Sequence, residues 1–220
     1  MTQRKRNRAY GGSIGIVKFP DLWFTNKYKQ HGDFEGDSRE AALKYVTDNW
    51  CAVDGGAHCG IWTDRLCRVF SHVVAFEPHP ENYQYLIDNV QRTNLTTYQY
   101  ALGEEIGSAG MEPGPDDDPN LNSGQWHLSN VCGAIDVQVS PLDAFNLYNV
   151  GFIKLDVEGY EYFALKGAEK TIKKWRPVVL IEENGLCSRY GIKDGQCGEL
   201  LESWGYSRAQ RVRKDEIWTP

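Results

Sequence analysis

The chain has 220 residues, of which 41% are hydrophobic and 25% are charged, and its formal net charge is −6. This length and composition predict one globular domain, residues 37–220, preceded by an N-terminal extension at residues 1–36. The negative charge argues against broad nucleic-acid binding, which requires a positive surface.

The sequence carries no membrane or secretory signal. No apolar run approaches the roughly 20 residues that a membrane span needs. The basic residues at 1–8 are not followed by an apolar stretch, so no signal peptide is expected. The six cysteines form no C-x-x-C pair, which indicates free thiols in a reducing compartment and predicts a cytoplasmic protein.

Strand and helix patterns alternate along the chain after residues 1–36, which are expected to be irregular apart from a strand-like patch at 14–19. Asp37 followed by Glu40 resembles a capping box that opens a helix. The segment 104–135 is expected to be a long loop without regular structure, and such a loop is usually either functional or disordered. The alternation predicts an α/β fold, a doubly wound and mostly parallel sheet with helices on both faces. The expected elements are helices at about 37–46, 61–70, 80–90, 141–145, 160–175 and 197–204, strands at 50–54, 73–76, 96–101, 135–139, 152–156 and 178–182, and a hairpin at 206–219.

The most informative stretch is a glycine-rich turn at Val53–Gly60, in which Asp54 ends an apolar strand. The next strand ends on Glu77. The carboxyl ends of neighbouring parallel strands meet at one edge of a sheet, where ligands bind. We therefore expect Asp54 and Glu77 on the rim of one nucleoside-sized pocket. Glu77 would accept both hydroxyls of a ribose, and the glycines would let the backbone touch the ligand.

Asp54 indicates which nucleoside the pocket takes. A dinucleotide site presents bare amides to the pyrophosphate, which a carboxylate would repel, and the turn lacks the G-x-G-x-x-G pattern. S-adenosylmethionine (SAM) has no phosphate and carries an α-amine and a sulfonium, so an acid suits it. A tight strand-to-helix turn in an unrelated α/β protein is the alternative, and Glu77 at the next strand end counts against it.

Six short motifs occur together in an order and spacing that resemble one known family. They are Val53–Gly60, Ala75–Pro80, Ala101–Gly103, Leu142–Asp143, Phe152–Glu161 and Arg176–Glu182. Together they resemble the FkbM family of SAM-dependent methyltransferases over about residues 50–185.

This resemblance implies a Rossmann-like class I methyltransferase fold with seven strands, the last of them antiparallel. It also implies methyl transfer from SAM to an oxygen, often a hydroxyl of a sugar or natural product. His58 stands where the family usually has asparagine, and a left-handed backbone tolerates histidine, so we expect it to fill the turn rather than to act in catalysis. The expected cofactor residues are Asp54, Gly55, Gly56, Ala57, Gly60, Glu77, Pro78, Ala101 and Leu102.

A hydroxyl acceptor must lose its proton during methyl transfer, so a general base is expected. Asp156 and Glu158 follow the fourth core strand and are the first candidates for the base or for orienting the acceptor. The structural alternatives are that Asp156 caps the next helix and that Glu158 binds SAM or a loop amide. His127 is a further candidate, beside Trp126, which could stack on a sugar ring. His79 is more simply a turn residue.

A metal is a weaker hypothesis. Glu182, Glu183 and Asn184 end the strand next to Asp156, and such oxygen ligands suit Mg²⁺ or Ca²⁺. The family resemblance requires no metal, and we predict none.

Three rival functions remain at this point. Methyltransferases that act on nucleic-acid bases usually carry Asn/Asp-Pro-Pro-aromatic after the fourth strand, where this chain has Asp156–Tyr160. An NAD-dependent oxidoreductase is disfavoured by Asp54. A non-catalytic nucleoside-binding or scaffold protein would leave Asp54, Glu77 and Asp156 without a use. We predict a small-molecule or glycan acceptor, no nucleic-acid partner and no membrane association; the oligomeric state is open.

Overall fold

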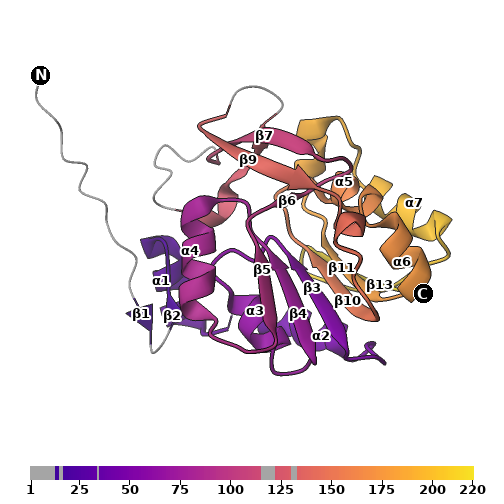
Figure 1. The fold of residues 1–220 in the computed structure, drawn as a ribbon, viewed down its shortest axis with the longest axis horizontal. Helices are drawn as coiled ribbons and strands as arrows, with labels where there is room; N and C mark the ends of the chain where they lie inside the picture. Colours follow the sequence, from indigo (N-terminus) through magenta and orange to yellow (C-terminus); the bar gives the residue numbers. More distant parts are fainter. Residues whose placement is uncertain (1–12, 15–16, 34, 115–121, 130–132) are drawn as a thin grey trace, which may run out of the picture.

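A seven-stranded sheet runs through the middle of the molecule (Figure 1). The structure is a computed structural model that describes residues 13–14, 17–33, 35–114, 122–129 and 133–220. In spatial order the strands are β12 (Ser207–Val212), β13 (Asp215–Thr219), β11 (Val178–Glu182), β10 (Val150–Leu155), β3 (Cys51–Gly55), β4 (His72–Phe76) and β5 (Leu95–Tyr98). The pairs from β11 to β5 are parallel, and β13 runs antiparallel to β11. The expected mostly parallel sheet with an antiparallel last strand is confirmed.

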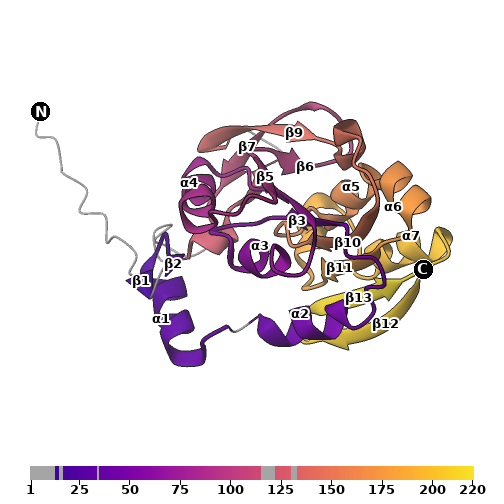
Figure 2. The same ribbon diagram turned by 60° about the horizontal axis from the view of Figure 1, so that its bottom comes forward.

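Helices cover both faces of this sheet (Figure 2). Because side chains alternate along a strand, Val53 and Ile153 pack in one hydrophobic cluster while their neighbours Ala52 and Phe152 pack in another. The expected doubly wound architecture is therefore confirmed. The first cluster includes residues of α5 (Glu161–Lys166), α6 (Glu169–Trp175) and α7 (Gln196–Ser203), and the second includes residues of α2 (Gly36–Leu43), α3 (Ile61–Leu66) and α4 (Pro80–Asn89).

A second, four-stranded sheet lies over the carboxyl ends of the central strands (Figure 1). The expectation of a structureless 104–135 segment is wrong, because residues 107–112 and 127–129 are strands that pair with each other, and residues 107–111 also pair with 135–139. The acidic stretch at 115–119 falls outside the described residues. The strands are β6 (Ala101–Leu102), β9 (Ile135–Ser140), β7 (Gly107–Glu112) and β8 (His127–Ser129), and short 3₁₀ turns occupy Ser123–Gln125, Leu142–Phe145 and Leu186–Tyr190.

The N-terminal part contains a helix, α1 (Leu22–His31), where the sequence predicted irregular structure. A short hairpin, β1 (Ser13–Ile14) and β2 (Val17–Lys18), precedes it. The Asp21 side chain caps α1 by accepting a hydrogen bond of 2.8 Å from the backbone N–H of Phe24. Phe24 packs with Phe19 and Cys59, so α1 is attached to the glycine-rich turn. The division between residues 36 and 37 stays a prediction.

Other element boundaries also differ from the expectation. The predicted capping box is wrong, because α2 begins after Glu35, and Asp37 instead forms an ion pair of 2.8 Å with Arg213. The helix expected at 160–175 is broken at Gly167, where a Cβ atom would lie 1.9 Å from the carbonyl oxygen of Gly103. The strand expected at 96–101 divides into β5 and β6, which belong to different sheets. Among the described residues, no helix is both long and apolar enough to cross a membrane.

Candidate active site

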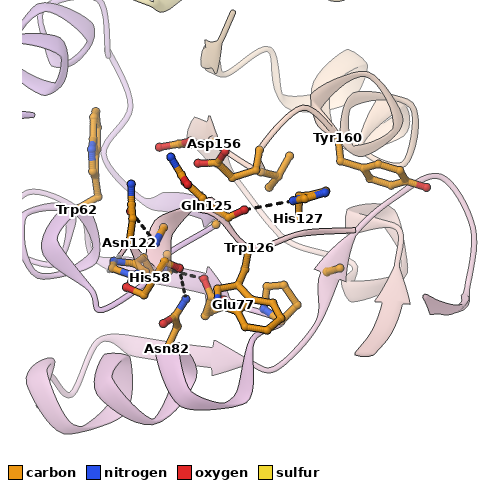
Figure 3. Close-up of a pocket in the computed structure, with 18 of the residues that line it drawn as sticks. His58, Trp62, Glu77, Asn82, Asn122, Gln125, Trp126, His127, Asp156 and Tyr160 are labelled. Carbon is orange, nitrogen blue, oxygen red and sulfur yellow. Dashed lines mark hydrogen bonds between the residues drawn. The ribbon is translucent and has the colours of Figure 1, made fainter. Parts of the chain in front are cut away.

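A cavity of about 380 Å³ lies beyond the carboxyl ends of β3, β4 and β10 (Figure 3). Its volume falls within the range of ligand pockets, roughly 300–1,000 Å³. Asp54, Gly55 and Gly60 lie outside its wall. The other predicted residues line it together: Gly56, Ala57, Glu77, Pro78, Ala101 and Leu102 of the cofactor set, and Asp156, Glu158 and His127 of the catalytic set.

Glu77 forms one side of the cavity. Its carboxylate accepts backbone hydrogen bonds from His58, at 2.8 Å, and from His79, at 2.9 Å. Burial raises the pKa of Glu77 to about 7, and the two N–H groups only partly offset this. Each carboxylate oxygen has a further lone pair. The geometry therefore leaves Glu77 able to accept hydrogen bonds from a pair of hydroxyls.

The glycine-rich turn is shaped by close packing. Gly56 has a φ of 74°, and a Cβ atom there would lie 1.8 Å from the carbonyl oxygen of Asp156. Gly60 has a φ of 90°, and its Cβ would lie 2.6 Å from Val90. Gly55 is enclosed by Leu102 and Leu155. Gly56 thus shapes the cavity wall directly, while Gly55 and Gly60 shape the turn behind it.

Substitution of Gly56 should disrupt this packing. Gly56→Ala is expected to lower the free energy of unfolding by about 3 kcal/mol or more, because it combines a strained φ with a clash against backbone. Gly191→Ala is the matched control, since Gly191 also has a positive φ, 77°, in the left-handed helical region, but open space around it. The control should lose only about 1–2 kcal/mol. Denaturant unfolding measures both, and equal losses would contradict the packing role.

Asp54 lies beneath the cavity rather than on its rim. Its side chain is fully buried and accepts a hydrogen bond of 2.6 Å from Thr63 Oγ1. The Lys154 ammonium lies 3.2 Å from the other carboxylate oxygen. The two residues face each other because β3 and β10 pair in register at this point. The expectation that both acids reach the rim is therefore wrong for Asp54, whose carboxylate pairs with Lys154 beneath the cavity.

Lys154 is a site residue that the motif reasoning missed. Its Nζ lies 3.7 Å from the Asp156 carboxylate and donates to the backbone carbonyl of Gly56 at 3.0 Å. Burial opposes the charged form, but the carboxylates of Asp54 and Asp156 outweigh it and raise the pKa of Lys154. A lysine inside an otherwise apolar strand was the available signal, because such a charge is buried only with partners.

Asp156 and Glu158 stand across the cavity from Glu77, with Asp156 visible there in Figure 3. Glu158 has a φ of 56°. Burial, and then the Asp156 carboxylate, raises the pKa of Glu158 to about 8. Ligand atoms of Asp156, Glu158 and Glu182 lie within 4.8 Å of one another. These three could bind a metal by type, but the ammonium group of Lys214 already pairs with Glu182.

The turn that carries Glu158 is fixed from below by Glu161. The Glu161 carboxylate is buried and accepts backbone hydrogen bonds from Val157, at 2.9 Å, and Gly159, at 3.3 Å. Burial is also the main reason that the pKa of Glu161 is raised well above its usual range. Glu161 therefore holds the backbone on both sides of Glu158 and does not line the cavity.

Residues of the four-stranded sheet and of the turn Ser123–Gln125 line the side of the cavity that lies away from the central sheet. We call this side the roof. His127 lines the cavity, and burial lowers its pKa. Trp126 also lines it, but its ring packs on His79 at a centroid distance of 4.4 Å. His58 has the positive φ expected for its position, 50°, and its ring nitrogen lies 2.7 Å from Ser123 Oγ. Burial lowers the pKa of His58 to about 3, so this ring is neutral and serves as a bridge to the roof.

Known proteins share both the sequence and the fold. Residues 54–207 match the profile of the Methyltransferase FkbM domain. The hexuronic acid methyltransferase AglP of Haloferax volcanii is 25% identical over 178 residues, which cover 78% of this chain and 70% of AglP.

Two solved structures illustrate the shared fold. Methyltransferase FkbM of Methylobacillus flagellatus has a TM-score of 0.50 at 21% identity, over 78% of this chain and 43% of that one, so this chain spans less than half of its length. SMU.1697c of Streptococcus mutans, solved with S-adenosylhomocysteine (SAH), has a TM-score of 0.50 at 9% identity, over 83% and 94% of the two chains. At these identities the likeness concerns the fold.

Proposed function

Because the chain belongs to the FkbM family of SAM-dependent methyltransferases, we propose that it transfers the methyl group of SAM to an oxygen atom of a carbohydrate. The observation that carries the proposal is the cavity itself, in which Glu77 and the pair Asp156 and Glu158 occupy opposite sides. A donor nucleoside and an acceptor oxygen could therefore meet between them. A hexuronic acid is the acceptor in the name of AglP, which supports a carbohydrate.

The cavity fits SAM in volume and in charge. When bound, SAM supplies a methyl group on a positively charged sulfur. Glu77 would accept the two ribose hydroxyls, and Gly56 and Ala57 would offer close backbone contact. Pro78, Ala101 and Leu102 would form the apolar wall around the adenine ring. Asp54 and Gly60 would support this wall from behind.

Asp156 is the residue that we assign as the general base. Its carboxyl group lines the cavity and lies 3.7 Å from the Lys154 ammonium. Glu158, with its pKa raised to about 8, is mostly protonated at neutral pH and would instead donate a hydrogen bond to the acceptor. His127 lies on the roof of the same cavity and would contact the acceptor from the opposite side.

Acceptor screening with radiolabelled methyl-SAM tests the proposal. We expect label to move to a sugar or uronic acid, and not to RNA, because the chain is acidic overall. A uronic acid offers both hydroxyls and a carboxylate. Treatment of the product with alkali distinguishes methylation of a hydroxyl from methylation of the carboxylate, since a methyl ether resists alkali and a methyl ester is cleaved. Transfer to RNA or protein alone would contradict a carbohydrate acceptor.

A further inference from the structure

Glu35 lines the cavity from the segment that joins α1 to α2. It is the N-cap residue of α2, yet its side chain makes no capping hydrogen bond. Among the described residues, no ion pair or side-chain hydrogen bond reaches this carboxylate. Helix capping by the Glu35 side chain therefore does not explain its position in the cavity wall.

Three lysines that line the cavity, Lys27, Lys154 and Lys214, act on the charge of Glu35. Burial, and then the Asp156 carboxylate, raises the pKa of Glu35 to about 7, against the opposing effect of Lys154. The Lys154 ammonium already lies 3.2 Å from the Asp54 carboxylate and 3.7 Å from the Asp156 carboxylate. A ligand cation beside Glu35 would offset its burial and the repulsion from Asp156, which the lysines only partly balance.

Glu35 and Glu77 reach the cavity from different elements. Glu77 follows β4, and its carboxylate accepts hydrogen bonds from the backbone N–H groups of His58 and His79. Glu35 precedes α2 and lines the cavity together with Ile61 and Trp62, at the start of α3. The two acids therefore share none of these partners.

We propose that Glu35 binds the α-ammonium group of SAM. This inference rests on the proposed cofactor site and adds the residue that holds its amino-acid end. The sequence predicted Asp54 as an acid on the rim that suits SAM, but Asp54 is enclosed by Thr63 and Lys154 beneath the wall. Glu35 precedes residues 54–207, which match the family, so a segment outside the shared region completes the cofactor site.

Calorimetry with two ligands tests the assignment. SAH carries the amino-acid tail, and 5′-methylthioadenosine has the same nucleoside without it. Glu35→Gln should weaken SAH binding roughly tenfold or more, since it removes a charge-assisted hydrogen bond, and should leave methylthioadenosine binding unchanged. Glu35→Asp, which keeps the charge, should retain part of the SAH affinity. Glu40→Gln, an exposed acid on the same helix, is the matched control and should bind both ligands like the wild type.

Each outcome decides a separate point. Equal SAH affinity in Glu35→Gln and the wild type would overturn the role of Glu35 and leave the cofactor site intact. Equal weakening of both ligands would mean that Glu35 shapes the cavity and does not contact the ammonium, which also overturns the assignment. Failure of the wild type to bind either ligand would instead remove the cofactor site on which the inference rests.

Discussion

Glu77→Gln should weaken binding of both SAH and methylthioadenosine by roughly tenfold or more, because each ligand presents its ribose hydroxyls to this carboxylate. Glutamine keeps the size of the side chain and one acceptor oxygen, but it loses the negative charge and one acceptor. Its NH₂ group would also face a backbone N–H of His58 or His79, both of which now donate to the carboxylate. Calorimetry measures the two affinities, and thermal unfolding confirms that the variant is folded.

The pH dependence of the same affinity provides a second measurement for Glu77. Its pKa of about 7 in the free protein means that the carboxyl becomes protonated as the pH falls below neutrality. Methylthioadenosine affinity should therefore decline from pH 8 to pH 5.5 in the wild type. Glu35 and Glu158 titrate in the same range, so the informative quantity is the difference between the wild type and Glu77→Gln. Asp88→Asn, on the exposed side of α4, is the control; identical pH profiles for the wild type and Glu77→Gln would remove the ribose assignment.

Asp156→Asn should reduce turnover by roughly 10²- to 10⁴-fold, the usual contribution of a general base. SAH affinity should change much less, because asparagine keeps the size and polarity of the side chain. Single-turnover transfer of labelled methyl, with the acceptor identified by the screen, separates chemistry from binding. Glu158→Gln is the companion variant, and its loss should be smaller because a protonated glutamate and a glutamine both donate hydrogen bonds.

Full activity of Asp156→Asn would exclude Asp156 as the base. Alkali treatment of the methylated product would then distinguish two explanations for the retained activity. An alkali-labile product would identify a carboxylate acceptor, which carries no proton to remove. An alkali-stable product would move the base to another side chain of the cavity, and His127 would be examined next in the same assay.

The strand-end residues of the site could be predicted from the sequence because their positions follow from local pattern. An apolar strand, an acid and a glycine-rich turn fix where Glu77 and Gly56 lie, since parallel strands end at one edge. The orientation of Asp54 could not be predicted in the same way. It depends on Lys154, which lies about a hundred residues later in the chain and faces Asp54 only when β3 and β10 pair in register.

The sequence also did not predict α1, β7 and β8, because these elements depend on contacts with residues distant in the chain. The α1 sequence has few apolar residues on a common face, and the helix is attached through Phe24 to Cys59, a contact that no local pattern reveals. The strands β7 and β8 are short and pair with partners distant in sequence. Glu35 could not be recognised either, because a single glutamate before a helix resembles any other helix start until the cavity is seen.

The strand β12 forms one edge of the central sheet. Its residues from Ser207 to Arg211 are exposed, and Arg208 and Arg211 extend to Glu216 on β13, at 2.6 and 3.2 Å. An edge that carries guanidinium groups is a poor template for a further strand. This border therefore protects the protein against edge-to-edge aggregation, at the end of the sheet farthest from β5.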